Sequence, residues 1–329
     1  MRRFALLFVA ACSTTPTATA TGELGAWQTG PALPTPRANH CSAAIGDWLL
    51  VIGGNHQDAS GTFVKTDEIH AAKLAADGTL GPWQLAGHAP SPVSECTATS
   101  DGHRLYVIDG LYDTDGDNGK VYTADLDAAG MLSPLTAMTA LPQGAVAISS
   151  EATVHDSQLV VMHSSIDNDA TTALRTPLAS PAWTDGALGI AFRAQAQYAF
   201  TATHAYTLGG YHDTTAMLPD VFVASLSGGP AIPATPLPSA TGFGEAMAVD
   251  DYLFVVGGRS EVFGGTGSNA TYSAHIAADG SLEAWQPATA LPVGRTNHDL
   301  ALVGNYLVLT GGASSGGGDN TVLVSRVRD

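Results

Sequence analysis

Two short segments of the chain share a pattern of arginine, asparagine and histidine, residue types that bind charged or hydrogen-bonding ligands. They read RANH at residues 37 to 40 and RTNH at residues 295 to 298. A guanidinium presents two parallel donors to a carboxylate, and an imidazole can gain or lose a proton near neutral pH. If folding brings the two segments together, they would suit a carboxylate or a sugar acid. The alternative is that they only satisfy neighbouring backbone groups, because buried polar groups need partners.

A second candidate is acidic. Asp113, Asp115 and Asp117 alternate in the segment YDTDGDNG at residues 112 to 119. Alternating carboxylates can wrap a hard cation such as calcium. The glycines stand at 116 and 119 rather than at the sixth position of such a loop, and the twelfth position is not acidic. Calcium is therefore the one cofactor that the sequence suggests, and an ordinary solvated acidic loop is the alternative.

A repeated strand pattern would position these residues. Six apolar segments each end in a Gly-Gly pair or a degraded form of it, and the first residues of these closing pairs are 53, 109, 163, 209, 257 and 311. Their spacings of 46 to 56 residues match a four-stranded propeller blade and exceed most helical repeats. The third pair is replaced by His163-Ser164, so the count of six includes degraded repeats.

The repeats also share flanking residues. Leu-Pro precedes the arginine and histidine at 33 and at 291, and tryptophan follows the turns LAADGTLGPW and IAADGSLEAW, at Trp83 and Trp285. This pattern resembles the kelch repeat over residues 23 to 329. The resemblance implies an all-β, six-bladed kelch-like β-propeller, and a content of 37 Gly, 18 Pro and only 13% charged residues agrees with short strands joined by turns.

The two ends of the chain predict how the ring closes. Only 17 residues follow Gly312, enough for the third strand of the last blade and too few for the fourth. The segment ELGAWQT at residues 23 to 29 should supply the missing strand, so that the N-terminal strand pairs with the last blade. The first and sixth blades would then be neighbours.

Closure places the candidate residues on one face of the ring. Because strands alternate in direction, the connections between blades and the loops between second and third strands emerge on the same face. Loops on a rigid scaffold commonly form binding sites. We predict a binding site there from residues near the strand starts: Arg37, Asn39, His40, Glu95, Arg193, Glu245, Arg295, Asn297 and His298.

One pair of residues has a counterpart in a propeller enzyme. Tyr211-His212 resembles two copper ligands of galactose oxidase, which has a kelch-like propeller. The sequence offers no matching cysteine, second tyrosine and second histidine. A galactose oxidase-like propeller is therefore expected without its copper site.

The N-terminus predicts export. Arg2 and Arg3 precede the apolar run FALLFVAA, which is too short to span a bilayer and is typical of a signal peptide. The run ends in VAAC and resembles a bacterial lipoprotein signal, in which Cys12 is lipidated; an ordinary signal peptide with an incidental cysteine is the alternative. The expected divisions are a signal peptide at 1 to 11, a lipidated cysteine with a flexible tether at 12 to 22, and the propeller at 23 to 329.

The position after Cys12 and the other two cysteines refine the expected location. In the lipoproteins that this signal resembles, an aspartate after the lipidated cysteine favours retention in the inner membrane. Here that position is Ser13, so the resemblance implies an outer-membrane lipoprotein of the cell envelope. The periplasmic and the surface side both remain open. Cys41 and Cys96 would then meet an oxidising compartment. They form either a disulfide or two buried thiols.

The net charge limits the partners. With 13 Lys plus Arg against 30 Asp plus Glu, the chain carries −17, which excludes proteins that track nucleic-acid phosphates and polybasic membrane-surface proteins. Membrane contact is expected only through the lipid anchor. A carbohydrate or a protein fits as the partner, and we expect a monomer.

These observations predict an envelope-tethered binding module for a glycan or a protein, and favour a binding protein over an enzyme. One alternative is a sugar-acid isomerase or mutarotase, which a similarity to the sialic-acid epimerases of kelch type implies. Arg37, Arg295 and either Glu95 or Glu245 would then be the working groups. The other alternative is a structural envelope protein.

Overall fold

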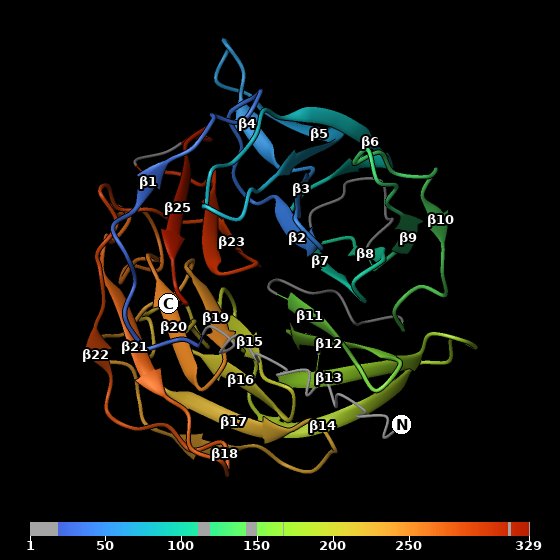
Figure 1. The fold of residues 1–329 in the computed structure, drawn as a ribbon. Coiled ribbons are helices and arrows are strands. Elements are labelled where there is room, and N and C mark those ends of the chain that lie inside the picture. The colour runs from blue at the N-terminus through green and yellow to red at the C-terminus, as the bar shows by residue number, and fades with distance from the viewer. Residues whose placement is uncertain (1–18, 111–118, 143–149, 167, 315–316, 329) are drawn as a thin grey trace, which may run out of the picture.

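The computed structural model describes residues 19 to 328, except 111 to 118, 143 to 149, 167 and 315 to 316. Its strands form six small antiparallel sheets arranged in a ring (Figure 1). The protein is thus an all-β, six-bladed β-propeller, and the predicted fold class is confirmed. Among the described residues, no helix is long and apolar enough to cross a membrane.

The first strand of each blade lies at the centre of the ring. These innermost strands are β2 (Cys41–Ile45), β7 (Thr97–Ser100), β11 (Ser150–His155), β15 (Gln197–Phe200), β19 (Glu245–Val249) and β23 (Asp299–Val303). Each contacts the innermost strands of both neighbouring blades, including β2 against β23. They surround an axial channel, and their starts define its mouth.

The other strands build outward. The second strands are β3 (Trp48–Ile52), β8 (Arg104–Ile108), β12 (Gln158–Ser165), β16 (His204–Leu208), β20 (Tyr252–Val256) and β24 (Tyr306–Thr310). The third are β5 (Phe63–Lys73), β9 (Val121–Asp125), β13 (Ala170–Pro177), β17 (Val221–Ser225), β21 (Thr271–His275) and β25 (Val322–Arg326). The outer ones are β6 (Gln84–Val93), β10 (Thr136–Ala137), β14 (Thr184–Ile190), β18 (Ile232–Ala234), β22 (Gln286–Pro287) and β1 (Gln28–Thr29). The first blade also carries β4 (Asn55–Gln57), which pairs with β5.

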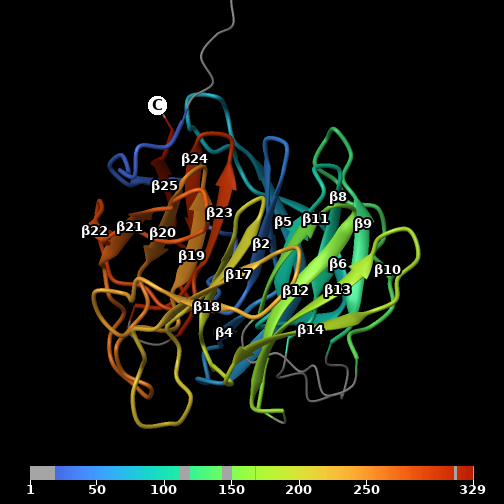
Figure 2. The ribbon, with the colours of Figure 1, turned by 90° about the horizontal axis from the view of Figure 1, so that it is seen from below.

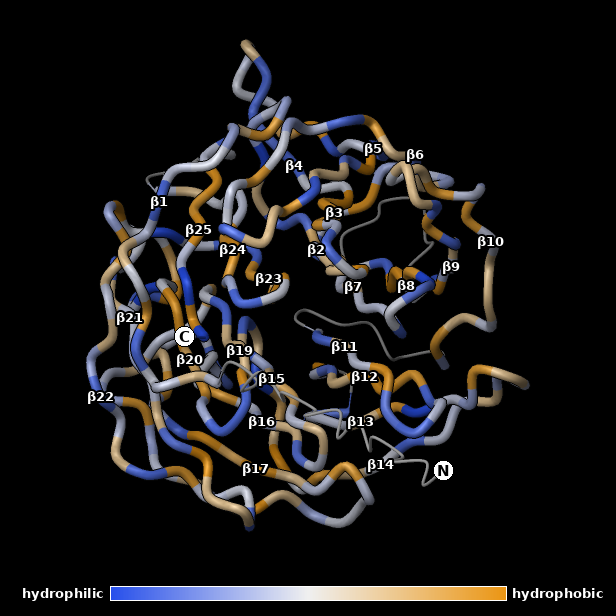
Figure 3. The backbone as a smooth tube through the Cα atoms, viewed as in Figure 1, coloured by the Kyte–Doolittle hydropathy of each residue, from blue (hydrophilic) through white to orange (hydrophobic). Residues whose placement is uncertain are grey.

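The core lies between the blades. The second strands are mostly apolar, as in WLLVI, because both of their faces are covered by neighbouring blades. Leu50 and Ile52 pack toward the second blade, whereas Leu49 and Val51 pack toward the sixth. Figure 3 shows this hydrophobic character along the strands of the blades.

The repeated tryptophans join adjacent blades at their outer edges. Each indole Nε1–H donates to a backbone carbonyl that follows the outer strand of the preceding blade. The bonds run from Trp27 to Thr289, from Trp83 to Pro31, from Trp183 to Thr139 and from Trp285 to Thr235, at 2.9 to 3.1 Å. The tryptophan of the repeat is therefore a structural connection between blades.

The ring is closed by the N-terminal strand, as the sequence predicts. β1 pairs antiparallel with β25, with Gln28 opposite Val324. Leu24 and Trp27 precede β1 and are buried in the core of the sixth blade. Asp250 contacts residues near both ends of the described part of the chain, because it accepts the backbone N–H of Ala20 at 2.8 Å and pairs with Arg328 at 2.7 Å.

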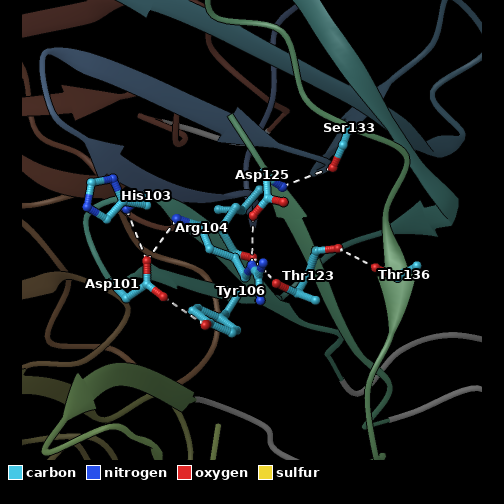
Figure 4. Close-up of polar contacts among 9 residues, drawn as sticks. Asp101, His103, Arg104, Tyr106, Thr123, Asp125, Ser133 and Thr136 are labelled. Carbon is cyan, nitrogen blue, oxygen red and sulfur yellow. Dashed lines mark hydrogen bonds and ion pairs between the residues drawn. The ribbon is translucent and has the colours of Figure 1, made fainter. Parts of the chain in front are cut away.

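The two faces of the ring differ. Figure 2 shows β4, part of the loop between the second and third strands of the first blade, at the end of the ring opposite the C-terminus. The face on the side of the C-terminus has short turns. In the second blade, Asp101 accepts the backbone N–H groups of His103 and Arg104 and the hydroxyl of Tyr106 (Figure 4). The longer loops lie on the face that carries the channel mouth.

Candidate functional site

The arginines of the two repeated segments are buried away from the channel mouth. Arg37 is 0% exposed and donates to the Gly53 carbonyl at 2.9 Å and to Thr35 Oγ1 at 2.6 Å. Arg295 is also buried, and its Nη1 lies 2.5 Å from Asp319 Oδ2. Each side chain thus joins the segment that leads into its blade to the end of the second strand or the loop that follows it. Their contacts are those of a scaffold.

Arg193 is held in the same way in the fourth blade. Its Nη2 lies 3.0 Å from Asp220 Oδ2, at the end of the loop between the second and third strands. Its guanidinium also lies over the ring of Phe222. The three predicted arginines thus occupy equivalent positions in their blades and share one structural role.

The histidines lie between blades. Burial, with Arg37 and His298 nearby, lowers the pKa of His40 to about 3, and burial beside Arg295 lowers the pKa of His298 to about 3. Both imidazoles are therefore neutral. A Cβ added at Gly311 would lie 2.7 Å from the ring of His40, and one at Gly257 would lie 2.8 Å from the ring of His298. The recurring glycine thus makes room for the histidine of the next blade.

Five residues, one from each of five blades, form a collar around the mouth. They are Asn39, Glu95, Gln195, Phe243 and Asn297, with φ values from 52° to 60°. Side chains other than glycine rarely adopt this left-handed conformation, and for a bulky residue such as phenylalanine it is an outlier. Such conformations concentrate at functional sites. The equivalent position in the third blade lies outside the described residues.

Backbone hydrogen bonds link the collar from blade to blade. Glu95 N–H donates to the carbonyl of Asn39 at 2.6 Å, and Asn39 N–H donates to that of Asn297 at 3.0 Å. Asn297 donates to Phe243 at 2.8 Å, and Phe243 to Gln195 at 3.2 Å. In addition, Asn297 Nδ2 donates to Asn39 Oδ1 at 2.6 Å. The collar is therefore held rigidly while all five residues border the pocket.

The mouth pocket has a polar rim, and two aromatic residues, Tyr198 and Phe243, border it. Its volume is about 80 Å³, and no lysine or arginine of the described chain borders it. Phe243 forms an aromatic wall and is backed by two side chains: the ring centroids of Phe243 and Tyr211 are 6.4 Å apart, and the Arg259 guanidinium carbon lies 3.7 Å from the centroid of Phe243. This wall is fixed before any ligand arrives.

A layer of three carboxyl groups lies below the collar. Glu151, Glu245 and Asp299 sit at the starts of β11, β19 and β23 and border a channel cavity of about 210 Å³ beneath the mouth pocket. Burial raises the pKa of Asp299 to about 7. Burial and the nearby Asp299 raise the pKa values of Glu151 and Glu245 well above their ordinary range. Burial thus favours the protonated form of these three carboxyl groups, which can donate as well as accept hydrogen bonds.

Glu95 adds a fourth carboxyl group, at the rim. Burial raises its pKa to about 7, an effect that Lys65 partly opposes. Its buried Oε2 atom has no hydrogen-bond partner in the described part of the chain. Glu95 is thus a carboxyl group that changes charge near neutral pH and has an unused acceptor at the mouth.

The structure divides the residues predicted from sequence into three groups. Asn39, Glu95 and Asn297 stand in the collar, and Glu245 stands in the carboxylate layer. Arg37, Arg193 and Arg295 brace the scaffold, and His40 and His298 pack between blades with one side on the pocket. The segment with Asp113, Asp115 and Asp117 lies outside the described residues. Among the described residues, no group of three His, Cys, Asp or Glu is arranged to hold a metal ion.

Four residues of the site were not predicted from the sequence: Gln195, Phe243, Glu151 and Asp299. Counting positions back from the closing pair of each blade would have identified them. Every collar residue stands 14 positions before the first residue of the closing pair of its blade, as Phe243 does before Gly257. Each residue of the carboxylate layer stands 12 positions before it, as Asp299 does before Gly311.

The two cysteines lie beside this site. Cys41, at the start of β2, and Cys96, just before β7, are joined by a disulfide that links the first and second blades. Cys96 also borders the mouth pocket. The bond thus fixes the spacing of two collar residues, Asn39 and Glu95.

Comparisons with known proteins show the fold alone. A scan against protein-family models finds no match, and a search of curated proteins finds none. Among solved structures, one described as "Structure of YjhT" is similar with a TM-score of 0.69 and 14% sequence identity, over 91% of this chain and 99% of that chain. At this identity the two chains share an architecture, and the collar and carboxylate layer remain the basis for any function.

Proposed function

We propose that this propeller is a binding module whose channel mouth takes a neutral or positively charged glycan. The observation that carries the proposal is the mouth pocket itself, with amide and carboxyl side chains around its rim, one fixed aromatic wall at Phe243, and the carboxylate layer below. Sugars present hydroxyl groups to hydrogen-bonding side chains and an apolar ring face to an aromatic ring. Sites for small ligands typically combine an apolar wall with a few placed polar groups.

The charge of the site disfavours a sugar acid. The guanidinium groups that would bind a carboxylate are engaged with Gly53, Asp220 and Asp319. No described lysine or arginine borders the pocket, so a carboxylate ligand would find no cation there. Glu95 would also repel it once the pH rises above the Glu95 pKa of about 7. An uncharged or amino-substituted sugar meets donors and acceptors that suit it.

The dependence of glycan binding on the charge of the glycan and on pH tests this proposal. On an array of neutral, amino-substituted and acidic glycans, we expect binding to the first two classes and none to the acidic class. A quaternised amino-sugar glycan keeps its charge at every pH. Its binding should tighten roughly 3- to 10-fold from pH 6 to pH 8, because Glu95 and Asp299, with pKa values of about 7, ionise over this range and an ion pair adds about 1 kcal/mol.

The Glu95→Gln variant is the control for the pH dependence. Glutamine keeps the shape of the side chain and cannot ionise, so the variant should show a flatter profile between pH 6 and pH 8. Selective binding of acidic glycans by the wild-type protein would refute the proposal.

A second function is favoured by one observation. Glu95 combines a pKa of about 7 with an unused buried acceptor, which suits a general acid or base. We infer that the site could interconvert the anomers of a bound sugar, a reaction that needs proton transfer and no cofactor. Faster anomer exchange of a bound glycan, measured by NMR and lost in Glu95→Gln, would establish catalysis; unchanged exchange would leave a binding module.

The repeats and the N-terminus suggest a family and a location. We propose a kelch-type propeller, because the glycine that accommodates histidine and the tryptophan that joins blades recur along the chain. We also propose an outer-membrane lipoprotein, and a disulfide between Cys41 and Cys96 agrees with an oxidising compartment. Calcium at Asp113, Asp115 and Asp117 stays a prediction.

The lipid anchor is directly testable. Metabolic labelling with a radioactive fatty acid in a bacterial host should label the wild-type chain, and Cys12→Ala should abolish the label because the cysteine that would carry the lipid is gone. Label that persists in Cys12→Ala, or its absence from the wild-type protein, would contradict the anchor and leave an ordinary signal peptide.

A further inference from the structure

A separate cavity lies in the fifth blade, outside the channel mouth. It has a volume of about 180 Å³ and lies between the connection that leads into β19 and the loop between β20 and β21. No described residue that borders it also borders the mouth pocket, although Arg259 of this cavity contacts Phe243 of the mouth. The proposal for this cavity does not rest on the function proposed for the mouth.

Arg259 borders this cavity and forms no close ion pair with a described carboxylate, although Glu261 raises its pKa through a longer-range charge interaction. It forms no ion pair within 4 Å with any described carboxylate, including the exposed Glu261 in the same loop, whereas Arg193 and Arg295 are both paired. Its Nη2 donates to the Val262 carbonyl at 3.0 Å, and its buried Nε has no partner among the described residues. A guanidinium remains charged even where burial lowers its pKa, as it does here.

The guanidinium is also held in place. Its carbon lies 3.7 Å from the centroid of the Phe243 ring, and the Val262 carbonyl restrains one of its nitrogens. A planar, positioned guanidinium loses less conformational freedom when it binds an anion than a mobile surface side chain does. Arg259 is thus a fixed cation with unused donor capacity.

Hydroxyl groups border the same cavity. Ser239, Ser260 and Tyr272 contribute hydroxyls that make no hydrogen bond with a described residue, and Thr241 and Ser268 contribute two more that do. Hydroxyl donors beside an arginine form the usual recognition set for the oxygens of phosphate, sulfate or carboxylate groups. Among the described residues, no carboxylate borders this cavity.

We propose that the Arg259 cavity is an oxyanion site that binds a phosphate, sulfate or carboxylate group. Arg259 supplies the charge and the donors of its guanidinium, and Tyr272, Ser260 and Ser239 supply neutral donors. In a chain with a net charge of −17, an arginine that forms no ion pair with a described carboxylate is the feature that points to an anionic ligand.

NMR titration of the whole chain with inorganic phosphate, at constant ionic strength, tests the site. We expect saturable shifts of amides in residues 257 to 272 in the wild-type protein. Arg259→Gln should weaken binding at least 10-fold, and Arg259→Lys should weaken it less because the charge remains. Arg104→Gln is the matched control. Arg104 is the first residue of β8 and is paired with Asp125. This variant should bind phosphate as the wild type does.

Parallel titrations with sulfate and acetate show which oxyanion the site prefers. If Arg259→Gln fails to fold, Tyr272→Phe with Ser260→Ala removes neutral donors and leaves the charge, and it should weaken phosphate binding several-fold. No saturable shifts with any of the three anions, or equal binding by Arg259→Gln and the wild type, would overturn the proposal.

Discussion

Deletion of residues 23 to 29 should prevent the ring from closing and produce a protein that unfolds at a much lower temperature or aggregates. The segment contributes Leu24 and Trp27 to the core of the sixth blade and covers the edge of β25. Loss of one buried leucine or tryptophan side chain costs about 2 to 5 kcal/mol. The two together approach the total stability of many domains, about 5 to 15 kcal/mol.

Thermal unfolding and size-exclusion chromatography would measure this effect. Trp27→Ala should lower the melting temperature less than the deletion, because the strand pairing with β25 remains. Gln28→Ala is the matched control: its side chain is exposed, and its melting curve should overlay that of the wild type. A deletion variant with an unchanged melting curve would contradict closure by the N-terminal strand.

Loss of the Cys41–Cys96 disulfide should cause the second large effect. The bond joins residues 55 positions apart, and a loop of that length corresponds to about 4 kcal/mol of stabilisation in the chain-entropy model. The paired substitution Cys41→Ser with Cys96→Ser should lower the denaturant midpoint accordingly. It should also loosen the collar, because Asn39 and Glu95 are each one or two positions from a bonded cysteine.

Reductant provides the control for this variant. Dithiothreitol should shift the wild-type denaturation curve to that of the double variant and leave the variant unchanged. A double variant as stable as the oxidised wild type would show that the bond does not constrain the unfolded chain.

The architecture could be predicted because a short sequence pattern, an apolar strand with its closing pair, repeats along the chain. Four of the six blades end the second strand in a Gly-Gly pair and the other two in a degraded form of it, and these pairs recur every 46 to 56 residues. The shortage of residues after Gly312 then required a strand from the N-terminus, which β1 supplies. The spacing of the repeats and the number of residues after Gly312 were enough to predict the closed ring, because neither depends on where the side chains point.

The site was harder to predict because a motif does not show where its side chains point. In RANH and RTNH, the arginine turns into the scaffold, the histidine packs between blades with one side on the pocket, and the asparagine stands in the collar. Phe243 belongs to no motif, and it becomes part of the site only because its blade repeats the register of the others. The carboxylate layer emerges when strands from three blades, far apart in sequence, converge on the axis.

One measurement tests most directly whether the channel mouth is the binding site. The strongest glycan from the array would be titrated by calorimetry into the wild type, the double variant Asn39→Gly with Asn297→Gly, and Phe63→Ser. Glycine removes the side chains and keeps the left-handed backbone of the collar, and Phe63 is a loop-face control at the β4–β5 hairpin with 61% of its surface exposed. We predict binding at least 10-fold weaker in the double variant and unchanged in Phe63→Ser. Full affinity in the double variant, or loss of binding in Phe63→Ser, would contradict the mouth as the site and place it on the surrounding loops.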